Sequence, residues 1–229
     1  MAADGALVED ATGADRAQPV PDLSAGRGAV AGCVFCHPDA QPTALAETQR
    51  VRLVPDLFPL AQGHLLIISR EHLPCYGAAD AATLAELFDQ AALARRFIQE
   101  VYAVDPLLWE NGVSGQSVYH AHLHLMPLRL EGFIDALASA HESVEIDGWD
   151  AVRQRYREQG KYHYASLHDR QWLLDGNSVM NWEVRRLVAI AAGLRLVDGR
   201  WTRVTTHDDV TAVARRWKQW SAGLSSAPG

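Results

Sequence analysis

The first half of the chain combines two hydrophobic patterns, one typical of strands and one typical of a helix. After Asp80, apolar residues recur every three to four positions, which predicts one long helix with Asp80 as its N-cap. Short apolar or alternating runs on both sides of this helix predict strands at residues 45–54 (two strands around a turn), 63–69, 107–110 and 119–126. The tight connections predict an α+β fold, in which the helix packs on one face of an antiparallel sheet.

The second half predicts a smaller set of helices and hairpins. We expect a helix over residues 147–159 that Gly160 ends, and a hairpin over 161–174. A second helix over 183–192 and a hairpin over 194–204 should follow, because Asp-Gly at the centre of the hairpin favours a tight type I′ turn. Thr206 or Asp208 is the expected cap of a last helix. These elements predict a small carboxy-terminal α/β extension.

Composition narrows the class of protein. Hydrophobic residues make up 48% of the 229 positions, which is enough for a packed core, and no apolar run is long enough to cross a membrane. Residues 1–27 are rich in Ala, Gly, Asp and Pro and lack the apolar stretch of a signal peptide, so we expect a mobile tail. With only three cysteines and no export signal, a cytoplasmic location is expected.

The net charge of −7 argues against broad nucleic-acid binding. Its distribution is uneven: residues 1–146 carry 8 Lys and Arg against 19 Asp and Glu, whereas residues 147–229 carry 13 against 9. Cations for a polyanionic substrate would therefore come from the extension. The alternative is that these basic residues lie on ordinary solvated helix faces.

The most informative segment is His120-Ala121-His122-Leu123-His124. Side chains alternate between the faces of a strand, so the three histidines should project from one side and their apolar neighbours into a core. Imidazoles can bind a metal, shuttle protons or attack phosphorus. A row of three therefore suits a metal site or covalent phosphoryl chemistry, with a histidine-rich strand that has no task as the remaining alternative.

These residues resemble the signature of the histidine triad (HIT) family, in which three histidines alternate with hydrophobic residues. Four upstream segments support the resemblance, which covers about residues 30–130: Asn111-Gly112, Gly115 to Tyr119, the Gly-His strand Gly63 to Ile68, and Asp56 to Pro59. The resemblance implies an enzyme that acts on a small nucleotide substrate and forms a homodimer. The charge and the hydropathy given above add that no nucleic-acid or membrane partner is expected. It divides the chain into a tail at 1–27, a catalytic domain at 28–131, the extension at 132–220 and a second tail at 221–229.

The resemblance also implies roles for individual residues. His122, the middle histidine, would attack the α-phosphorus of a nucleotide ester, anhydride or phosphoramidate and form a nucleotidyl-histidine. His124 would contact the α-phosphate, and Gln116 and Ser117 would face the leaving group. Asn111 would lie near the phosphate or ribose.

On the nucleoside side, the resemblance implies His64 and Asp56, the latter as a ribose-binding acid. His124 stands where the uridylyltransferase branch of the family has glutamine, which argues against that branch.

Cys33 and Cys36 have the two-residue gap that lets two sulfurs reach one tetrahedral ion, although redox pairs share this spacing. The resemblance to the zinc-containing subgroup implies His72 and His120 as further ligands of a structural Zn²⁺, with His37 as a competing ligand. Cys75 has no partner in this scheme, and we expect it to be a buried apolar residue.

Residues 184–189 of the extension weakly resemble additions found in some bacterial members, which implies that Arg185 or Arg186 could bind a distal phosphate. The alternative is that these two arginines are simply exposed on the surface of a helix. Two other functions remain open at this point, namely a nucleotide- or partner-binding protein without turnover, and a redox or metal-transfer module built on the cysteine pair. Base preference and the choice between hydrolase and transferase are also open.

Overall fold

The structure is a computed structural model that describes residues 29–37, 39, 42–128, 139, 141–177, 188, 190, 196–197, 200–201 and 207–225. The predicted tail at residues 1–27 lies outside the described residues, as does most of the predicted helix at 183–192. Within that helix only Val188 and Ile190 are described, and both are helical.

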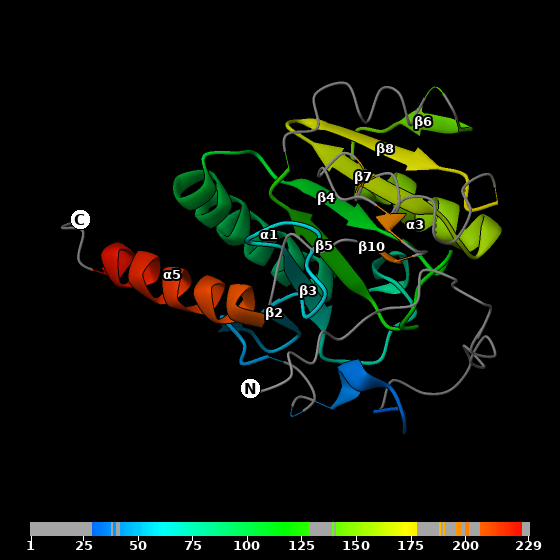
Figure 1. Cartoon of the computed structure of the whole chain (residues 1–229). Coiled ribbons are helices and arrows are strands. Elements are labelled where there is room, and N and C mark those ends of the chain that lie inside the picture. Colours follow the sequence, from blue (N-terminus) through cyan, green and yellow to red (C-terminus); the bar gives the residue numbers. More distant parts are fainter. Residues whose placement is uncertain are drawn as a thin grey trace.

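One eight-stranded antiparallel sheet forms the centre of the molecule (Figure 1). Its strands lie in the order β1-β2-β3-β5-β4-β7-β8-β6. Their bounds are β1 Ala46–Glu47, β2 Val51–Pro55, β3 Leu65–Ser69, β4 Leu107–Glu110, β5 His122–Met126, β6 Ser143–Glu145, β7 His163–Leu167 and β8 Arg170–Leu174. A separate hairpin pairs β9 (Leu196–Val197) with β10 (Arg200–Trp201), as the Asp-Gly pattern predicts.

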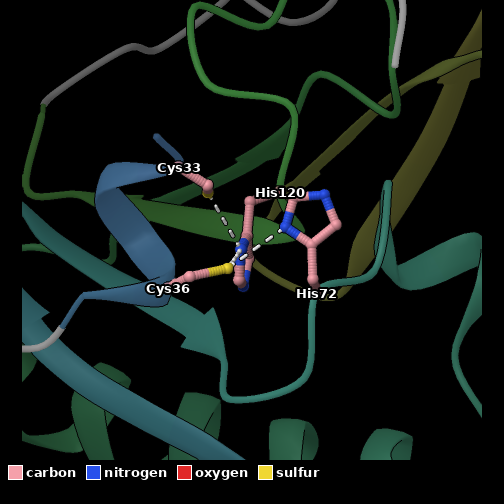
Figure 2. A group of neighbouring side chains, drawn as sticks. All are labelled: Cys33, Cys36, His72 and His120. Carbon is pink, nitrogen blue, oxygen red and sulfur yellow. Dashed lines mark hydrogen bonds between the residues drawn. The ribbon is translucent and has the colours of Figure 1, made fainter. Parts of the chain in front are cut away.

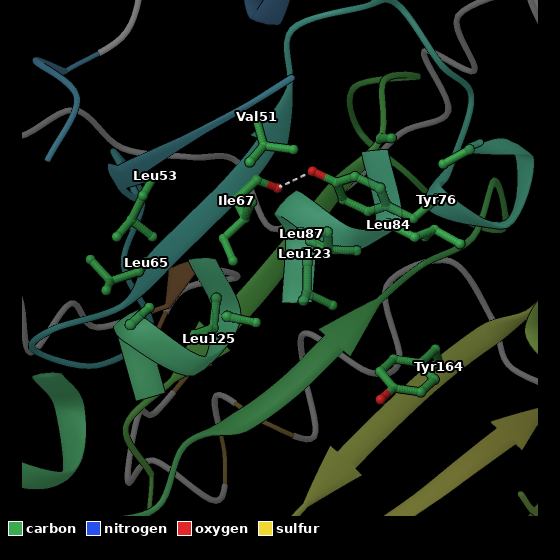
Figure 3. Packing of buried hydrophobic residues seen from close by; sticks show 14 of the residues in the cluster. Val51, Leu53, Leu65, Ile67, Tyr76, Leu84, Leu87, Leu123, Leu125 and Tyr164 are labelled. Carbon is green, nitrogen blue, oxygen red and sulfur yellow. Dashed lines mark hydrogen bonds between the residues drawn. The ribbon is translucent and has the colours of Figure 1, made fainter. Parts of the chain in front are cut away.

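In the described part of the chain, three α-helices contribute to the core on one face of this sheet: α1 (Ala81–Tyr102), α3 (Trp149–Gln159) and α5 (His207–Ser225). The strands turn every second side chain toward this core, including Leu53 of β2, Ile67 of β3 and Leu123 of β5 (Figure 3). Leu87 of α1 and Trp217 of α5 pack against them. The predicted α+β fold with a long helix on an antiparallel sheet is confirmed.

Local signals define the ends of the helices. The Asp80 carboxylate accepts a hydrogen bond from the Thr83 amide at 2.8 Å, which confirms the predicted N-cap of α1. Gly160 adopts a left-handed conformation at the end of α3, as expected. α5 begins at His207, so Asp208 lies inside this helix and is not its cap. Among the described residues, no helix is both long and apolar enough to span a bilayer.

The carboxy-terminal extension continues the central sheet, because β7 pairs with β4 (Leu108 with Ser166, Trp109 with Ala165). Two short 3-10 helices are described: η1 (Val34–Cys36), which packs on β2 and β3 through Phe35, and η3 (Tyr76–Ala78), which contacts α3. Beside η3, the fully buried Glu110 carboxylate accepts hydrogen bonds from the Tyr162 hydroxyl at 2.6 Å and the Tyr76 amide at 2.7 Å. A polar contact within the core therefore ties the extension to the first half of the chain.

This contact predicts a pH-dependent stability. Burial raises the pKa of Glu110 from 4.5 to about 7, so the folded chain keeps a proton that the unfolded chain releases. The free energy of unfolding should therefore fall as the pH rises from about 4.5 to about 7. The Glu110→Gln side chain cannot ionise. Across that pH window, the free energy of unfolding of wild type should therefore fall by on the order of 3 kcal/mol relative to that of the variant.

Urea unfolding of both proteins at pH 4.5, 6, 7 and 8 measures this difference directly, because other titrating groups are common to both. A difference that stays constant with pH would contradict ionisation of Glu110.

Candidate active site and metal centre

The face of the sheet opposite the helices carries the candidate site. β5 pairs with β3 so that His122 lies opposite Ile68 and His124 opposite Leu66. The intervening Leu123 belongs to the helix-covered core. The alternation predicted from sequence therefore holds for His122 and His124, whose ring centroids lie 5.0 Å apart. His120 precedes β5 instead of lying within it, contrary to the predicted strand at 119–126.

His122 is oriented by the backbone of its own segment. Its Nδ1–H donates a hydrogen bond of 2.6 Å to the carbonyl oxygen of His120, which leaves the lone pair on Nε2. The ring is only 4% exposed, and burial lowers the pKa of His122 below its usual value. The side chain is therefore neutral near pH 7, with a nucleophilic nitrogen of defined position.

A second hydrogen-bonded chain ends at His124. The Leu60 amide donates to Nδ1 of His64 at 3.2 Å, so this nitrogen is the acceptor and Nε2 carries the ring proton. That nitrogen lies 3.1 Å from Nδ1 of His124, which then accepts and carries its own proton on Nε2. His124 is thereby set as a hydrogen-bond donor through Nε2, the form suited to a phosphate oxygen.

Asp56 supplies negative charge beside these two rings. Its Oδ2 lies 3.4 Å from Nδ1 of His64 and 3.9 Å from Nδ1 of His124, while Oδ1 accepts from the Phe58 amide at 2.8 Å. Asp56, His64 and His124 lie close enough together to hold a metal ion. Because the Leu60 amide hydrogen points at Nδ1 of His64, a hydrogen-bonded pair accounts for this arrangement better than a metal site.

The loop between β4 and β5 carries the other residues expected at the site. Gln116 is buried, and within the described part of the chain its amide oxygen and nitrogen have no hydrogen-bond partner. Ser117 is exposed and lines a cavity of about 310 Å³ together with Cys33, His72 and Tyr119. The Asn111 side-chain oxygen accepts from Trp109 Nε1 at 2.8 Å, so this oxygen already has a partner within the protein.

Cys33, Cys36, His72 and His120 come together as a candidate metal centre (Figure 2). Cys36 Sγ lies 3.3 Å from Nδ1 of His72 and 3.6 Å from Nδ1 of His120, and Cys33 Sγ lies 3.5 Å from Nδ1 of His120. The four ligand atoms all lie within 4.8 Å of one another. Two sulfurs and two imidazole nitrogens form a donor set that suits Zn²⁺, so the cluster could bind a metal. His37 is exposed and is not part of this cluster.

The surroundings of His120 support its role in the cluster. Its Nε2–H donates to the Ser69 carbonyl oxygen at 2.7 Å, so Nδ1 carries the lone pair that faces the thiols. Burial lowers the pKa of His120 to about 3 and raises the pKa of Cys33 above its usual value. The first residue of the triad thus points away from the nucleophile and toward the cysteines.

Sequence reasoning missed two residues that link these groups. The Phe35 ring lies edge-on to His120 and His122, with centroid distances of 5.8 and 5.1 Å. The Phe35 carbonyl accepts a hydrogen bond of 2.7 Å from the buried guanidinium of Arg52. An arginine within the apolar strand 51–55 was a signal that this side chain has a buried partner, although the sequence does not say which one. Arg185 and Arg186, the expected phosphate ligands, lie outside the described residues.

Comparison with known proteins gives consistent matches. A family model described as HIT domain matches residues 38–131. The chain is 31% identical over 147 residues to adenosine 5'-monophosphoramidase HNT1 of Saccharomyces cerevisiae, covering 60% of this chain and 82% of the yeast protein. It is 30% identical to adenylylsulfatase HINT3 of Arabidopsis thaliana, covering 42% of this chain and 51% of that protein. A solved hypothetical protein from Leishmania major is 30% identical with a TM-score of 0.40, covering 42% and 73% of the two chains.

The hydrogen bonds predict the tautomers of three histidines. We expect His122 to carry its proton on Nδ1, because that atom donates to the His120 carbonyl, and His64 and His124 to carry theirs on Nε2. Long-range ¹H–¹⁵N correlation NMR at pH 7.5 distinguishes these forms by the ¹⁵N shifts of the two ring nitrogens. An Nε2–H tautomer at His122 would contradict the orientation described here.

Proposed function

Because the chain belongs to the histidine triad family, we propose that it is a nucleotide hydrolase or nucleotidyltransferase that acts at the α-phosphate of a nucleotide ester, anhydride or phosphoramidate. The observation that carries this proposal is the state of His122, a buried, neutral imidazole with its Nε2 lone pair available. The names of the yeast monophosphoramidase and the Arabidopsis adenylylsulfatase agree with this substrate class.

In the proposed reaction, Nε2 of His122 attacks the α-phosphorus and forms an N–P bond while the bond to the leaving group breaks. The leaving group departs with its electron pair and takes a proton from solvent by way of the Ser117 hydroxyl, which is exposed. His124 donates its Nε2–H to a non-bridging oxygen and stabilises the charge that develops there.

In the second step, water or another acceptor attacks phosphorus, the N–P bond breaks, and His122 returns to its neutral form as the attacking group loses its proton to solvent. Gln116 forms a hydrogen bond with the atom that bridges phosphorus and the leaving group, because its buried amide offers both a donor and an acceptor. Asp56 and His64 lie on the nucleoside side. Asn111 lies at the start of the same loop, beside the phosphate or ribose.

We also propose that Cys33, Cys36, His72 and His120 hold a structural Zn²⁺. Four protein ligands close a tetrahedral site, so the ion would stabilise the fold without taking part in the reaction. It would hold η1 against the segment that leads into β5. Its binding therefore supports the position of the nucleophile without contacting the substrate.

The mechanism predicts that His122→Ala lowers kcat by at least about three orders of magnitude, because no other group replaces the nucleophile. Turnover of a fluorogenic adenosine 5'-phosphoramidate measures this effect. Intact-mass spectra of rapidly quenched wild type should show a nucleotidyl adduct that the variant lacks. His168→Ala, which changes an exposed histidine of the β7–β8 hairpin, serves as the control and should retain activity.

Two results would contradict this proposal. Turnover that survives in His122→Ala would exclude the covalent route. Tight nucleotide binding by wild type without turnover would support the alternative, a nucleotide-binding protein that retains the fold without catalysis.

The metal proposal predicts about one equivalent of zinc per chain in protein purified without chelator. Cys33→Ser and Cys36→Ser should each fall well below half an equivalent and unfold at lower temperature, since the binding free energy contributes to folding. His37→Ala and Cys75→Ala, which change residues outside the cluster, should keep the metal. Equal zinc content in all four variants, measured by elemental analysis, would overturn the assigned ligand set.

A further inference from the structure

The loop that carries Gln116 and Ser117 has an unfavourable backbone conformation. Gly112, Val113 and Gly115 all have positive φ, at 49°, 77° and 68°. Glycine adopts such values readily, but a β-branched residue such as Val113 does so at a cost of about 1–3 kcal/mol. Contacts from outside the loop must therefore stabilise this conformation.

Those contacts come from the carboxy-terminal extension. The Tyr162 amide donates to the Gly112 carbonyl at 3.0 Å, and Tyr162 forms a parallel bridge with Val113. The Ser114 hydroxyl donates to the Gly176 carbonyl at 2.7 Å, and Ser114 is itself buried. Both flanks of the strained residue are thus bonded to residues beyond the matched family domain, which ends at residue 131.

Tyr162 is itself firmly held. Its hydroxyl donates to Glu110 at 2.6 Å and accepts from the Gly77 amide at 2.9 Å. The ring packs so closely on Gly112 and Gly77 that a Cβ at either glycine would come within 2.5 and 2.8 Å of it. The ring therefore acts as a rigid support beneath the start of the loop.

We propose that the extension positions Gln116 and Ser117 for the leaving group, with Tyr162 and Ser114 as positioning residues. This inference rests on the proposed function. Gln116 follows Ser114 by two residues, and its buried amide has no described partner that would hold it in place, so the backbone sets its location. A small displacement of this backbone would weaken assistance to the departing atom more than binding of the nucleotide.

Leaving groups of high basicity, such as alkylamines and alcohols, need a positioned donor as the bond to phosphorus breaks, whereas acidic phenols and acyl groups leave without one. Positioning by the extension should therefore matter most for basic leaving groups such as alkylamines.

Single-turnover release of the leaving group from a series of adenylates tests this inference, with p-nitrophenol at one end of the series and an alkylamine at the other. Ser114→Ala and Tyr162→Phe should each slow release of the alkylamine about tenfold and release of p-nitrophenol less than about twofold. The KM for the nucleotide should change little. Tyr164→Phe is the matched control: it removes a hydroxyl from β7, two residues after Tyr162, where that hydroxyl donates to Gln171, and should leave both rates unchanged.

The outcomes separate this inference from the proposed function. Wild type that releases no leaving group would overturn the proposed function, and this inference with it. Active wild type with equal losses for all leaving groups, or with no losses, would overturn only the positioning role, because a merely less stable protein loses activity uniformly. Unfolding temperatures of all variants identify any such loss of stability.

Discussion

The structure depends on the pleat of β5, which assigns alternate residues to two different environments. Leu123 and Leu125 enter the helix-covered core, where each contributes about 1.5–3 kcal/mol by leaving water. The same pleat forces His122 and His124 onto the opposite face. A slip of one residue would bury both imidazoles under α1 and expose the leucines, so the energetics of the core fix which face carries the histidines.

Burial of the triad rings is tolerated because His120, His122 and His124 each have a hydrogen-bond partner within the protein. His120 donates to the Ser69 carbonyl, His122 donates to the His120 carbonyl, and His124 accepts from His64. His120 therefore has two roles: its side chain faces the cysteines, and its carbonyl orients the proposed nucleophile. The candidate metal centre and the candidate active site share one residue, which couples the position of η1 to the orientation of His122.

Features with a short-range cause could be predicted from the sequence. The period of two in β5, the period near 3.6 in α1 and the Asp80 cap each depend on neighbouring residues, and each is confirmed. The sequence could not predict that β7 pairs with β4, nor which groups hydrogen-bond to Arg52 and His64. These contacts join segments that lie far apart in the chain. His120 leaves the expected strand for a similar reason, since the Ala121 amide bonds to the Leu73 carbonyl.

The pairing of β7 with β4 changes what the first half of the chain can do alone. Without it, β4 would be an edge strand with unpaired backbone groups, open to another chain. With it, the described sheet ends at the two short strands β1 and β6, so a homodimer cannot form by adding a strand to β4. The same pairing brings Tyr162 and Gly176 beneath the loop that follows β4. The same segment of the extension therefore covers the edge of β4 and supports the loop that follows it. The shape of the site depends on the extension for this reason.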